Sequence, residues 1–506
     1  MFERTAVQPA GLAGVTRRRR EQGAVRKQLL FVLVMLCGDL WAQAPMSDVV
    51  KSFVRVNASV VALQHVRVID GTGAAPAEDQ TVILEGGLIR AVGSAASTPA
   101  PAGATALDMT GYTVIPGLVG MHDHMFYPSP RTGRGVPPVY TELAYSGPRL
   151  YLAGGVTSLR TTGSIEPYTD LAVKKLIDSG VAPGPKIHIT GPYLEGPGAY
   201  TPNMHELTGP DDARKTVEYW ADEGATSFKA YMHITRAELS AAIEAAHKRG
   251  LKVTGHLCSI GFREAAALGI DDLEHGLLVD TEFDPDKAPD VCPPQPETAK
   301  TLGSLDVEGQ PVQEMMQDLA AHHVAVTSTL PVFETFVGPR PPLEARVLGA
   351  LAPELRSDYL ITRANRSGFD AATSAAAVLL KKEMQFERDF VKAGGLLLAG
   401  LDPTGYGGVV PGFGDQREVE LLVEAGFTSV EAIQIATANG ASFLGELDRI
   451  GTIAPGKSAD LVAIHGNPAK DINDIENVEI VFEDGVGYDS AKLIESVRDQ
   501  VGLHLI

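Results

Sequence analysis

Short apolar runs recur through the middle of the chain, and each ends in polar or glycine residues. From residue 115 onward these runs are rich in apolar and β-branched residues over three to five positions, which predicts strands. Amphipathic stretches such as 236–249 and 262–268 lie between several of them and predict helices. The eight predicted strands are residues 118–122, 156–160, 186–190, 227–230, 252–255, 272–274, 324–328 and 396–399.

Strand and helix alternate eight times, which is the pattern of a (β/α)8 barrel. A doubly wound open sheet is the competing fold. Against it, the first strand leads into His122-Asp123-His124 and not into a glycine-rich phosphate loop. Residues 330–393, between the last two strands, are long and mixed in character, which predicts an insertion over the barrel mouth. Such an insertion serves equally often as a lid or as decoration.

Both ends of the chain contain further short strands. Residues 59–93 alternate in β-rich runs with glycine turns, and similar runs resume after residue 451. We therefore predict an α/β fold, a (β/α)8 TIM barrel with a small β-sandwich domain built from both chain ends. The expected segments are a signal peptide at 1–44, β-sandwich parts at 45–114 and 449–506, and the barrel at 115–448.

The first 44 residues differ in composition from the rest of the chain. Four arginines at 17–20 precede an apolar run at 29–36, and Ala42 and Ala44 follow as small residues. This order predicts a secretory signal peptide and hence a periplasmic or secreted protein. The apolar run is too short for a stable membrane helix, so we expect no membrane span in the mature chain. A basic disordered tail with an apolar patch is the alternative.

Charge and cysteine content narrow the class of protein. The formal net charge of −20 argues against nucleic acid or an anionic membrane as a partner. Cys258 and Cys292 are the two cysteines beyond the leader. They are too few for a disulfide framework, although one bridge stays open. The sequence is also compatible with a homo-oligomer.

Metal-binding residue types stand at the ends of the predicted strands. His122 and His124 are two positions apart, so they project from the same face of a strand. Neutral imidazole is the commonest protein ligand for zinc-like ions. Because functional groups of a parallel barrel gather at the C-terminal strand ends, four more residues join this set. They are Lys229, His256, His275 and Asp402.

Each of these residues also has an ordinary structural explanation. The two histidines of the first strand could lie in a polar loop, and Lys229 could reach solvent. His256 could be a satisfied core histidine, while His275 and Asp402 could serve local turns. These separate structural explanations do not readily account for six such residues at five strand ends. The pattern therefore indicates a metal centre.

The motifs resemble those of the metal-dependent amidohydrolase superfamily. They comprise Val-Ile-Pro-Gly before His-x-His, Lys229, His256, Leu-Glu-His-Gly at 273–276, Asp402 and Gly-Thr-Ile-Ala-Pro-Gly-Lys-x-Ala-Asp-Leu-Val at 451–462. The likeness extends from about residue 59 to 490 and points to the imidazolonepropionase-related, dipeptidase-like branch. This branch includes dipeptidases and carboxypeptidases that act on Xaa-Pro or Xaa-Arg/Lys substrates.

The resemblance implies a centre of two divalent ions, which we expect to be zinc. In it His122, His124 and Asp402 hold one ion, His256 and His275 hold the second, and carboxylated Lys229 bridges them. A bridging hydroxide would attack the substrate, with Asp402 moving the proton. Deaminases of the superfamily tend to carry a glutamate three residues after the strand-five histidine, whereas this chain has Ser259 there.

We therefore expect hydrolysis of an amide C–N bond in a small molecule, a dipeptide or an N-acyl amino acid. A lactonase or phosphotriesterase using the same hydroxide is the alternative, and a non-catalytic scaffold is a third. Arg160 could clamp a carboxylate or form a structural ion pair. Tyr231 could hold a carbonyl or pack at the rim. The further candidates for substrate contact are His233, Tyr193, Thr161, Thr327 and Ser328.

Overall fold

A computed structural model describes residues 45–130, 139–368, 370–405 and 407–502. The predicted signal peptide at 1–44 lies outside the described residues. Each of the eight predicted parallel strands is present, with ends that differ from the prediction by one residue at most. They are β7 (Leu118–Asp123), β10 (Val156–Thr161), β11 (Lys186–Ile189), β12 (Ser227–Ala230), β13 (Lys252–Gly255), β14 (Asp272–Glu274), β15 (Ala325–Ser328) and β16 (Leu397–Ala399).

These strands form two parallel sheets, in the orders β11-β10-β7 and β12-β13-β14-β15-β16. A parallel bridge between Thr190 and Ser227 links them on one side. On the other side, the backbone N–H of Asp402 donates to the carbonyl of His122 at 3.0 Å. Gly400 permits this approach, because a Cβ there would overlap His122. The arrangement is a TIM-barrel-like α/β fold, and closure into one continuous barrel sheet stays a prediction.

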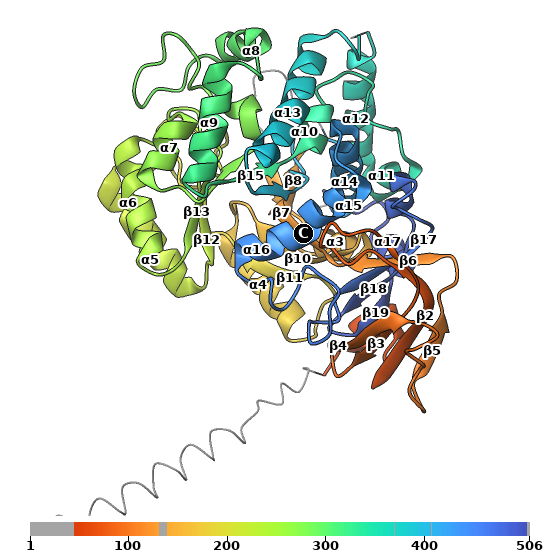
Figure 1. The fold of residues 1–506 in the computed structure, drawn as a ribbon. Helices are drawn as coiled ribbons and strands as arrows, with labels where there is room; N and C mark the ends of the chain where they lie inside the picture. The colour runs from red at the N-terminus through yellow and green to blue at the C-terminus, as the bar shows by residue number, and fades with distance from the viewer. Residues whose placement is uncertain (1–44, 131–138, 369, 406, 503–506) are drawn as a thin grey trace, which may run out of the picture. The chain divides into compact units, whose positions relative to one another are not determined.

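Helices follow most of these strands and lie outside them, as α5, α6, α7 and α9 do beside β12 and β13 (Figure 1). Many begin with proline at an early position or with a side-chain cap. The helices outside the insertion are α2 (Asp48–Phe53), α3 (Ser146–Ala153), α4 (Pro167–Asp178), α5 (Pro210–Glu223), α6 (Arg236–His247), α7 (Phe262–Leu268), η1 (Gly276–Val279), α8 (Gln295–Ser304), α9 (Gln310–Ala321), α14 (Phe413–Ala425), α15 (Ser429–Gln434), the π-helical η2 (Ile435–Asn439), α16 (Gly440–Leu444), η3 (Ile472–Glu476) and α17 (Ser490–Glu495).

The segment between β15 and β16, where the sequence predicts an insertion, is mainly helical. It contains α10 (Leu330–Glu334), α11 (Ala345–Ala350), α12 (Pro353–Arg366) and α13 (Ala375–Lys392). Two longer helices, α12 and α13, make up most of its second half. Buried Phe386 and Phe390 of α13 pack into the same hydrophobic core as the parallel strands. The insertion is thus tied to the body of the fold.

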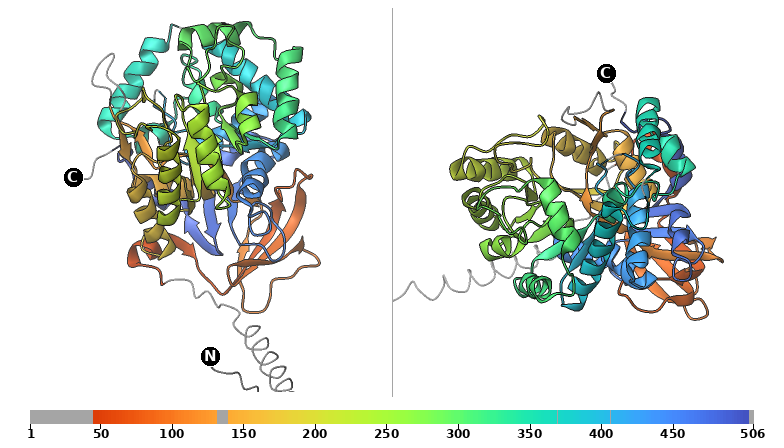
Figure 2. Two further views of the ribbon diagram at one scale, coloured as in Figure 1. Left: turned by 90° about the vertical axis from the view of Figure 1, so that its left-hand side faces the viewer. Right: turned by 90° about the horizontal axis from the view of Figure 1, so that it is seen from above.

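Strands from both chain ends join in one nine-stranded sheet, in the order β1-β19-β18-β17-β6-β2-β3-β4 with β5 beside β2. Figure 2 shows the N-terminal and C-terminal strands side by side. Its division into a β-sandwich and the expected domain boundaries stay predictions. The strands are β1 (Val54–Val56), β2 (Val60–Val68), β3 (Ala77–Glu85), β4 (Leu88–Ser94), β5 (Thr105–Asp108), β6 (Tyr112–Pro116), β17 (Leu461–His465), β18 (Val478–Glu483) and β19 (Val486–Asp489); a separate hairpin pairs β8 (Phe126–Pro128) with β9 (Tyr140–Glu142).

A charged cluster connects this sheet to the parallel strands. Lys186 at the start of β11 donates to Asp460 at 2.8 and 3.0 Å and to Asp484 at 2.8 Å. Burial opposes the charge of Lys186, but Asp460, Glu483 and Asp484 raise its pKa above its ordinary value. Asp460 belongs to the Lys-x-Ala-Asp stretch, so part of that motif has a structural function in joining the two sheets.

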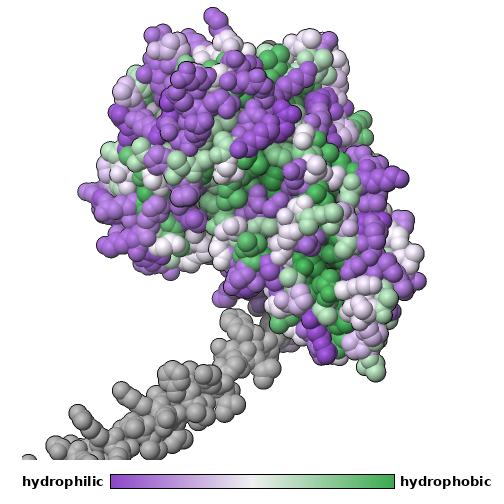
Figure 3. All heavy atoms as spheres, viewed as in Figure 1, coloured by the Kyte–Doolittle hydropathy of each residue, from purple (hydrophilic) through white to green (hydrophobic). Residues whose placement is uncertain are grey.

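The described helices give no sign of a bilayer span. Within the ranges given above, no helix combines the length and apolar character needed to cross a membrane. Hydrophilic residues cover much of the face seen in Figure 3, with hydrophobic residues in smaller groups between them.

Replacing Lys186 by methionine tests the junction between the sheets. We expect Lys186→Met to lower the free energy of unfolding by about 2–3 kcal/mol, because it leaves Asp460 buried without its cation. Urea unfolding measures the change. Lys174→Met removes an exposed ion pair with Asp178 and serves as the matched control, with an expected change within about 0.5 kcal/mol. Equal effects of the two substitutions would contradict the assignment.

Candidate metal centre

The six predicted ligand positions meet at the C-terminal ends of the parallel strands. The ring of His122 lies 5.2 Å from that of His124 and 4.5 Å from that of His275, measured between centroids. The rings of His256 and His275 are also 4.5 Å apart. Lys229 Nζ lies 3.1 Å from His122 Nε2. Residues separated by up to 280 positions in the chain therefore share one small volume.

Asp402 completes the group from the end of β16. Its Oδ1 lies 3.5 Å from His124 Nε2, and its Oδ2 lies 3.8 Å from His122 Nε2 and 3.9 Å from His275 Nε2. The potential ligand atoms of His122, His275 and Asp402 all lie within 4.8 Å of one another. This trio spans the two predicted ion positions. Asp402 and His275 have φ values of +48° and +69°, an uncommon backbone state often found at functional sites.

Contacts behind the rings orient three of the histidines. Nδ1 of His122 lies 2.7 Å from Glu274 Oε2, and Nδ1 of His124 lies 3.3 Å from the Gly163 carbonyl oxygen. Nδ1 of His275 lies 2.7 Å from Thr329 Oγ1. Nδ1 is thus engaged outward in each case. Nε2, with its lone pair, is then directed toward the other members of the group. Such contacts fix the tautomer of metal-ligating histidines.

Burial keeps the histidines uncharged. It lowers the pKa of His256 to about 3 and holds those of His122, His124 and His275 below their ordinary values. Burial likewise lowers the pKa of Lys229 to about 8, despite nearby carboxylates. For Asp402 burial opposes ionisation, but His122 and His124 hold its pKa well below its usual range. At neutral pH the group offers neutral imidazoles and one carboxylate.

This donor set fits divalent cations. Neutral imidazoles and a carboxylate are the ligands that zinc prefers in catalytic sites. Oδ1 of Asp402 is buried without a hydrogen-bond partner among the described residues, so it has an unused lone pair inside the group. A metal ion would satisfy such an atom. The geometry therefore supports metal binding by the residues that the sequence indicated.

Aromatic side chains surround the metal-binding group. Phe126 stacks on His124 with 4.3 Å between centroids, and Tyr231 lies 4.8 Å from His256. Phe333 of the insertion lies 5.7 Å from His275, which brings α10 to the edge of the site. Tyr193 and Tyr231 are edge to face at 5.0 Å. These rings place apolar surface around the metal-binding group.

The candidate substrate residues divide into two kinds. Tyr193 and Tyr231 lie within 6 Å of Lys229 Nζ, measured to their ring centroids, and so border the centre. Arg160 has instead the contacts of the ion-pair alternative. It is 1% exposed and donates to Asp272 at 2.9 Å, to Glu274 at 3.1 Å and to the Met121 carbonyl. We therefore leave Arg160 out of the proposed substrate contacts.

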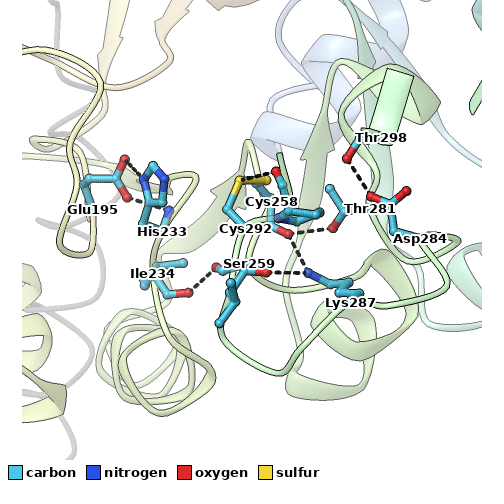
Figure 4. Close-up of a disulfide and its surroundings, with 12 residues drawn as sticks. Glu195, His233, Ile234, Cys258, Ser259, Thr281, Asp284, Lys287, Cys292 and Thr298 are labelled. Carbon is cyan, nitrogen blue, oxygen red and sulfur yellow. Dashed lines mark hydrogen bonds and ion pairs between the residues drawn. A yellow bond between two sulfur atoms is a disulfide. The ribbon is translucent and has the colours of Figure 1, made fainter. Parts of the chain in front are cut away.

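His233 lies on the turn after β12, and its side chain is 30% exposed. Figure 4 shows it facing Glu195. Its backbone N–H donates to Glu195 Oε1 at 2.7 Å, and its Nδ1 lies 3.4 Å from Glu195 Oε2. Glu195 raises the pKa of the His233 imidazole, so the ring gains a charged form more readily than a free histidine. Thr161, Thr327 and Ser328 are fully buried.

Several contributing residues escaped the sequence analysis. Glu274 and Thr329 orient metal-site histidines, and Glu195 holds His233. The sequence did offer a sign for Glu274, because this residue belongs to the Leu-Glu-His-Gly motif and directly precedes His275. It offered none for Thr329 and Glu195, since their roles depend on loops whose course the chain pattern does not predict.

Comparison with known proteins identifies the family. The amidohydrolase family model matches residues 113–308 and 357–486, which is more than half of the chain. The chain therefore belongs to the amidohydrolase family. This confirms the class indicated by the strand-end residues.

Solved structures support the fold. A Xaa-Pro dipeptidase with bound methionine in the active site is 21% identical, with a TM-score of 0.63 over 85% of this chain and 100% of its own. Bottromycin amidohydrolase is 20% identical, with a TM-score of 0.64 over 90% of this chain and 95% of its own. A sequence comparison gives a shorter match: a dihydroorotase of Pelobacter propionicus is 35% identical over 108 residues, which is 21% of this chain. That match spans about a quarter (23%) of the dihydroorotase.

The Thr329 contact predicts a measurable effect on metal affinity. We expect Thr329→Val to weaken zinc binding roughly tenfold or more, because His275 loses the partner that fixes its Nδ1. Competition with a chromophoric chelator measures the affinity. Thr437→Val, which removes a buried hydroxyl bonded to the Ile433 carbonyl, is the matched control and should leave zinc affinity unchanged. Unchanged affinity in Thr329→Val would remove the orienting role.

Proposed function

We propose that the protein is a binuclear metal-dependent hydrolase that cleaves an amide C–N bond, in a dipeptide or an N-acyl amino acid. The observation that supports this most is the meeting of His122, His124, Lys229, His256, His275 and Asp402 in one buried group. His122, His124 and Asp402 would hold one ion, and His256 and His275 the other. Zinc is the expected metal.

Lys229 is proposed to bridge the two ions as a carbamate. Carboxylation joins the neutral amine to carbon dioxide and releases a proton, which yields an anionic group with two oxygen ligands. The lowered pKa of Lys229 favours the neutral amine that this reaction needs. Its Nζ already lies 3.1 Å from His122 Nε2, within the group of ligands. An uncarboxylated ammonium would instead repel cations there.

Two divalent cations, when bound, would make water acidic near neutral pH and polarise the scissile carbonyl. Asp402 would accept the proton of the attacking water and pass it to the leaving nitrogen. Its position beside His122, His124 and His275 supports this role. Tyr231 and Tyr193 would pack against the substrate and exclude bulk water. His233 would contact a polar end of the substrate at the rim.

Several observations favour an amide substrate. The chain belongs to the amidohydrolase family, and proteins of similar fold include a Xaa-Pro dipeptidase and an amidohydrolase. Ser259 stands where deaminases of this superfamily tend to have glutamate. The aromatic border of the site suits a substrate with apolar groups beside the scissile bond.

Metal content and a substrate panel test the proposal. Purified protein should contain about two equivalents of zinc or manganese. It should hydrolyse dipeptides or N-acyl amino acids in preference to a cyclic amide, a lactone or a phosphotriester. Asp402→Asn should lower kcat by a factor of about 10² to 10⁴, since proton transfer is lost. Asp389→Asn, at a partly buried position on α13 whose side chain accepts a hydrogen bond from Lys392, is the control and should retain activity. A folded protein without metal would overturn the proposal.

We also propose a periplasmic or secreted location. The basic, apolar and small-residue order of the leader supports it, as does the bridge between Cys258 and Cys292, since disulfides persist in oxidising compartments. Expression of the full chain in a Gram-negative host should yield a processed protein in the periplasmic fraction. N-terminal sequencing should place the new end near residue 45. An unprocessed cytosolic product would contradict this.

A further inference from the structure

The two cysteines whose pairing the sequence left undecided, Cys258 and Cys292, are joined in a disulfide (Figure 4). Cys258 lies two residues after His256, in the loop that follows β13. Cys292 lies in the segment before α8, 34 positions further along the chain. The cross-linked stretch contains β14 and His275. His256 and His275 are the two proposed ligands of the second ion. His256 lies two residues before the segment closed by the disulfide, and His275 lies within that segment.

Hydrogen bonds reinforce the same anchor point. The Cys258 carbonyl accepts from Thr281 Oγ1 and from Lys287 Nζ, both at 2.6 Å. Lys287 also donates to the Val291 carbonyl at 3.3 Å, next to the second cysteine. One ammonium thus joins the backbone beside both sulfurs. The loop after His256 is tied at this point to the segment that follows His275.

The adjoining residue extends the anchor to the lysine-bearing strand. Ser259 donates its backbone N–H to the Met232 carbonyl at 2.9 Å and its hydroxyl to the Ile234 carbonyl at 2.5 Å. Those carbonyls belong to the turn after β12, which carries Tyr231 and His233. The disulfide and these hydrogen bonds therefore link the loop after β13 and the turn after β12 into one connected region that bears His256 and Tyr231. The residues proposed for the first ion come from β7 and β16, outside this region.

Other contacts of the cross-linked segment do not depend on sulfur. Asp290 accepts from the backbone and side chain of Arg236 at 2.8 to 3.1 Å, and Asp284 accepts from Thr298 at 2.5 Å. These would remain after reduction. Cys292 is partly exposed whereas Cys258 is buried, so we expect an external thiol to approach the disulfide from the Cys292 side. Reduction should loosen the anchor without unfolding the barrel.

We propose that the Cys258–Cys292 disulfide sets the affinity of the His256/His275 half of the metal centre, so that reduction selectively weakens the second ion. The inference rests on the proposed binuclear function. The chemical step is thiol–disulfide exchange with a dithiol reductant. The S–S bond accepts two electrons and two protons to give two thiols, and the dithiol becomes a disulfide.

Metal stoichiometry, measured apart from activity, tests the inference. The full protein in oxidised form and the Cys258→Ser/Cys292→Ser variant are titrated with a chelator, and zinc per chain is measured by mass spectrometry. We expect the variant to lose one ion at a roughly ten- to hundredfold lower chelator concentration than the oxidised protein, and the other ion at the same concentration. Wild-type protein reduced with a phosphine, which is then removed, should behave as the variant does. Far-UV circular dichroism verifies that each form is folded.

Variants that keep the disulfide make the test independent of the folding of the double mutant. Thr281→Val removes one donor to the Cys258 carbonyl and should weaken the second ion by a smaller factor. Thr298→Val removes a hydroxyl of the same region that bonds Asp284 and not Cys258, and should leave both affinities unchanged. Equal second-ion affinity in oxidised and disulfide-free protein would overturn the inference, as would equal losses in the two threonine variants. Oxidised protein that binds fewer than two ions would instead overturn the binuclear function, and the inference with it.

Discussion

Four imidazoles, a lysine and an aspartate share a buried volume at the ends of the parallel strands, and this crowding depends on keeping most of them uncharged. Burial lowers the pKa of the histidines, so that Asp402 is an anion among neutral imidazoles, and it lowers the pKa of Lys229 to about 8. Contacts within the described part of the chain leave this group incompletely satisfied, because Oδ1 of Asp402 has no hydrogen-bond partner there. The donor groups that it contains are suited to binding cations.

Much of the surrounding structure holds this group in place. Glu274 is buried between His122 and Arg160, so one carboxylate orients a ligand while its charge is balanced by a guanidinium. Arg160 in turn reaches Asp272 and the carbonyl of Met121. A network of this kind is costly to disturb, because the loss of one member leaves a buried charge without a partner. Precision at the centre thus depends on residues that do not themselves face it.

The same dependence extends to the loops. The disulfide and the donors to the Cys258 carbonyl act on backbone that leads directly from His256, whereas β7 and β16 are joined to each other by the hydrogen bond from Asp402 N–H to the His122 carbonyl. The two proposed halves of the centre are therefore supported by different covalent and hydrogen-bonded structures. This asymmetry would let an oxidising compartment affect one half more than the other.

The sequence by itself determined the eight strand positions, because apolar runs of three to five residues with polar ends have few other interpretations in a chain of this length. It also determined the six metal-site candidates, since parallel strands must bring their C-terminal ends to one face. It did not separate the two roles of Arg160, nor decide whether Cys258 and Cys292 pair. Those outcomes depend on the distance between residues more than 30 positions apart, which periodicity does not encode. Only the tertiary structure placed Glu274, Thr329 and Glu195 behind the histidines, because their partners come from other strands and loops.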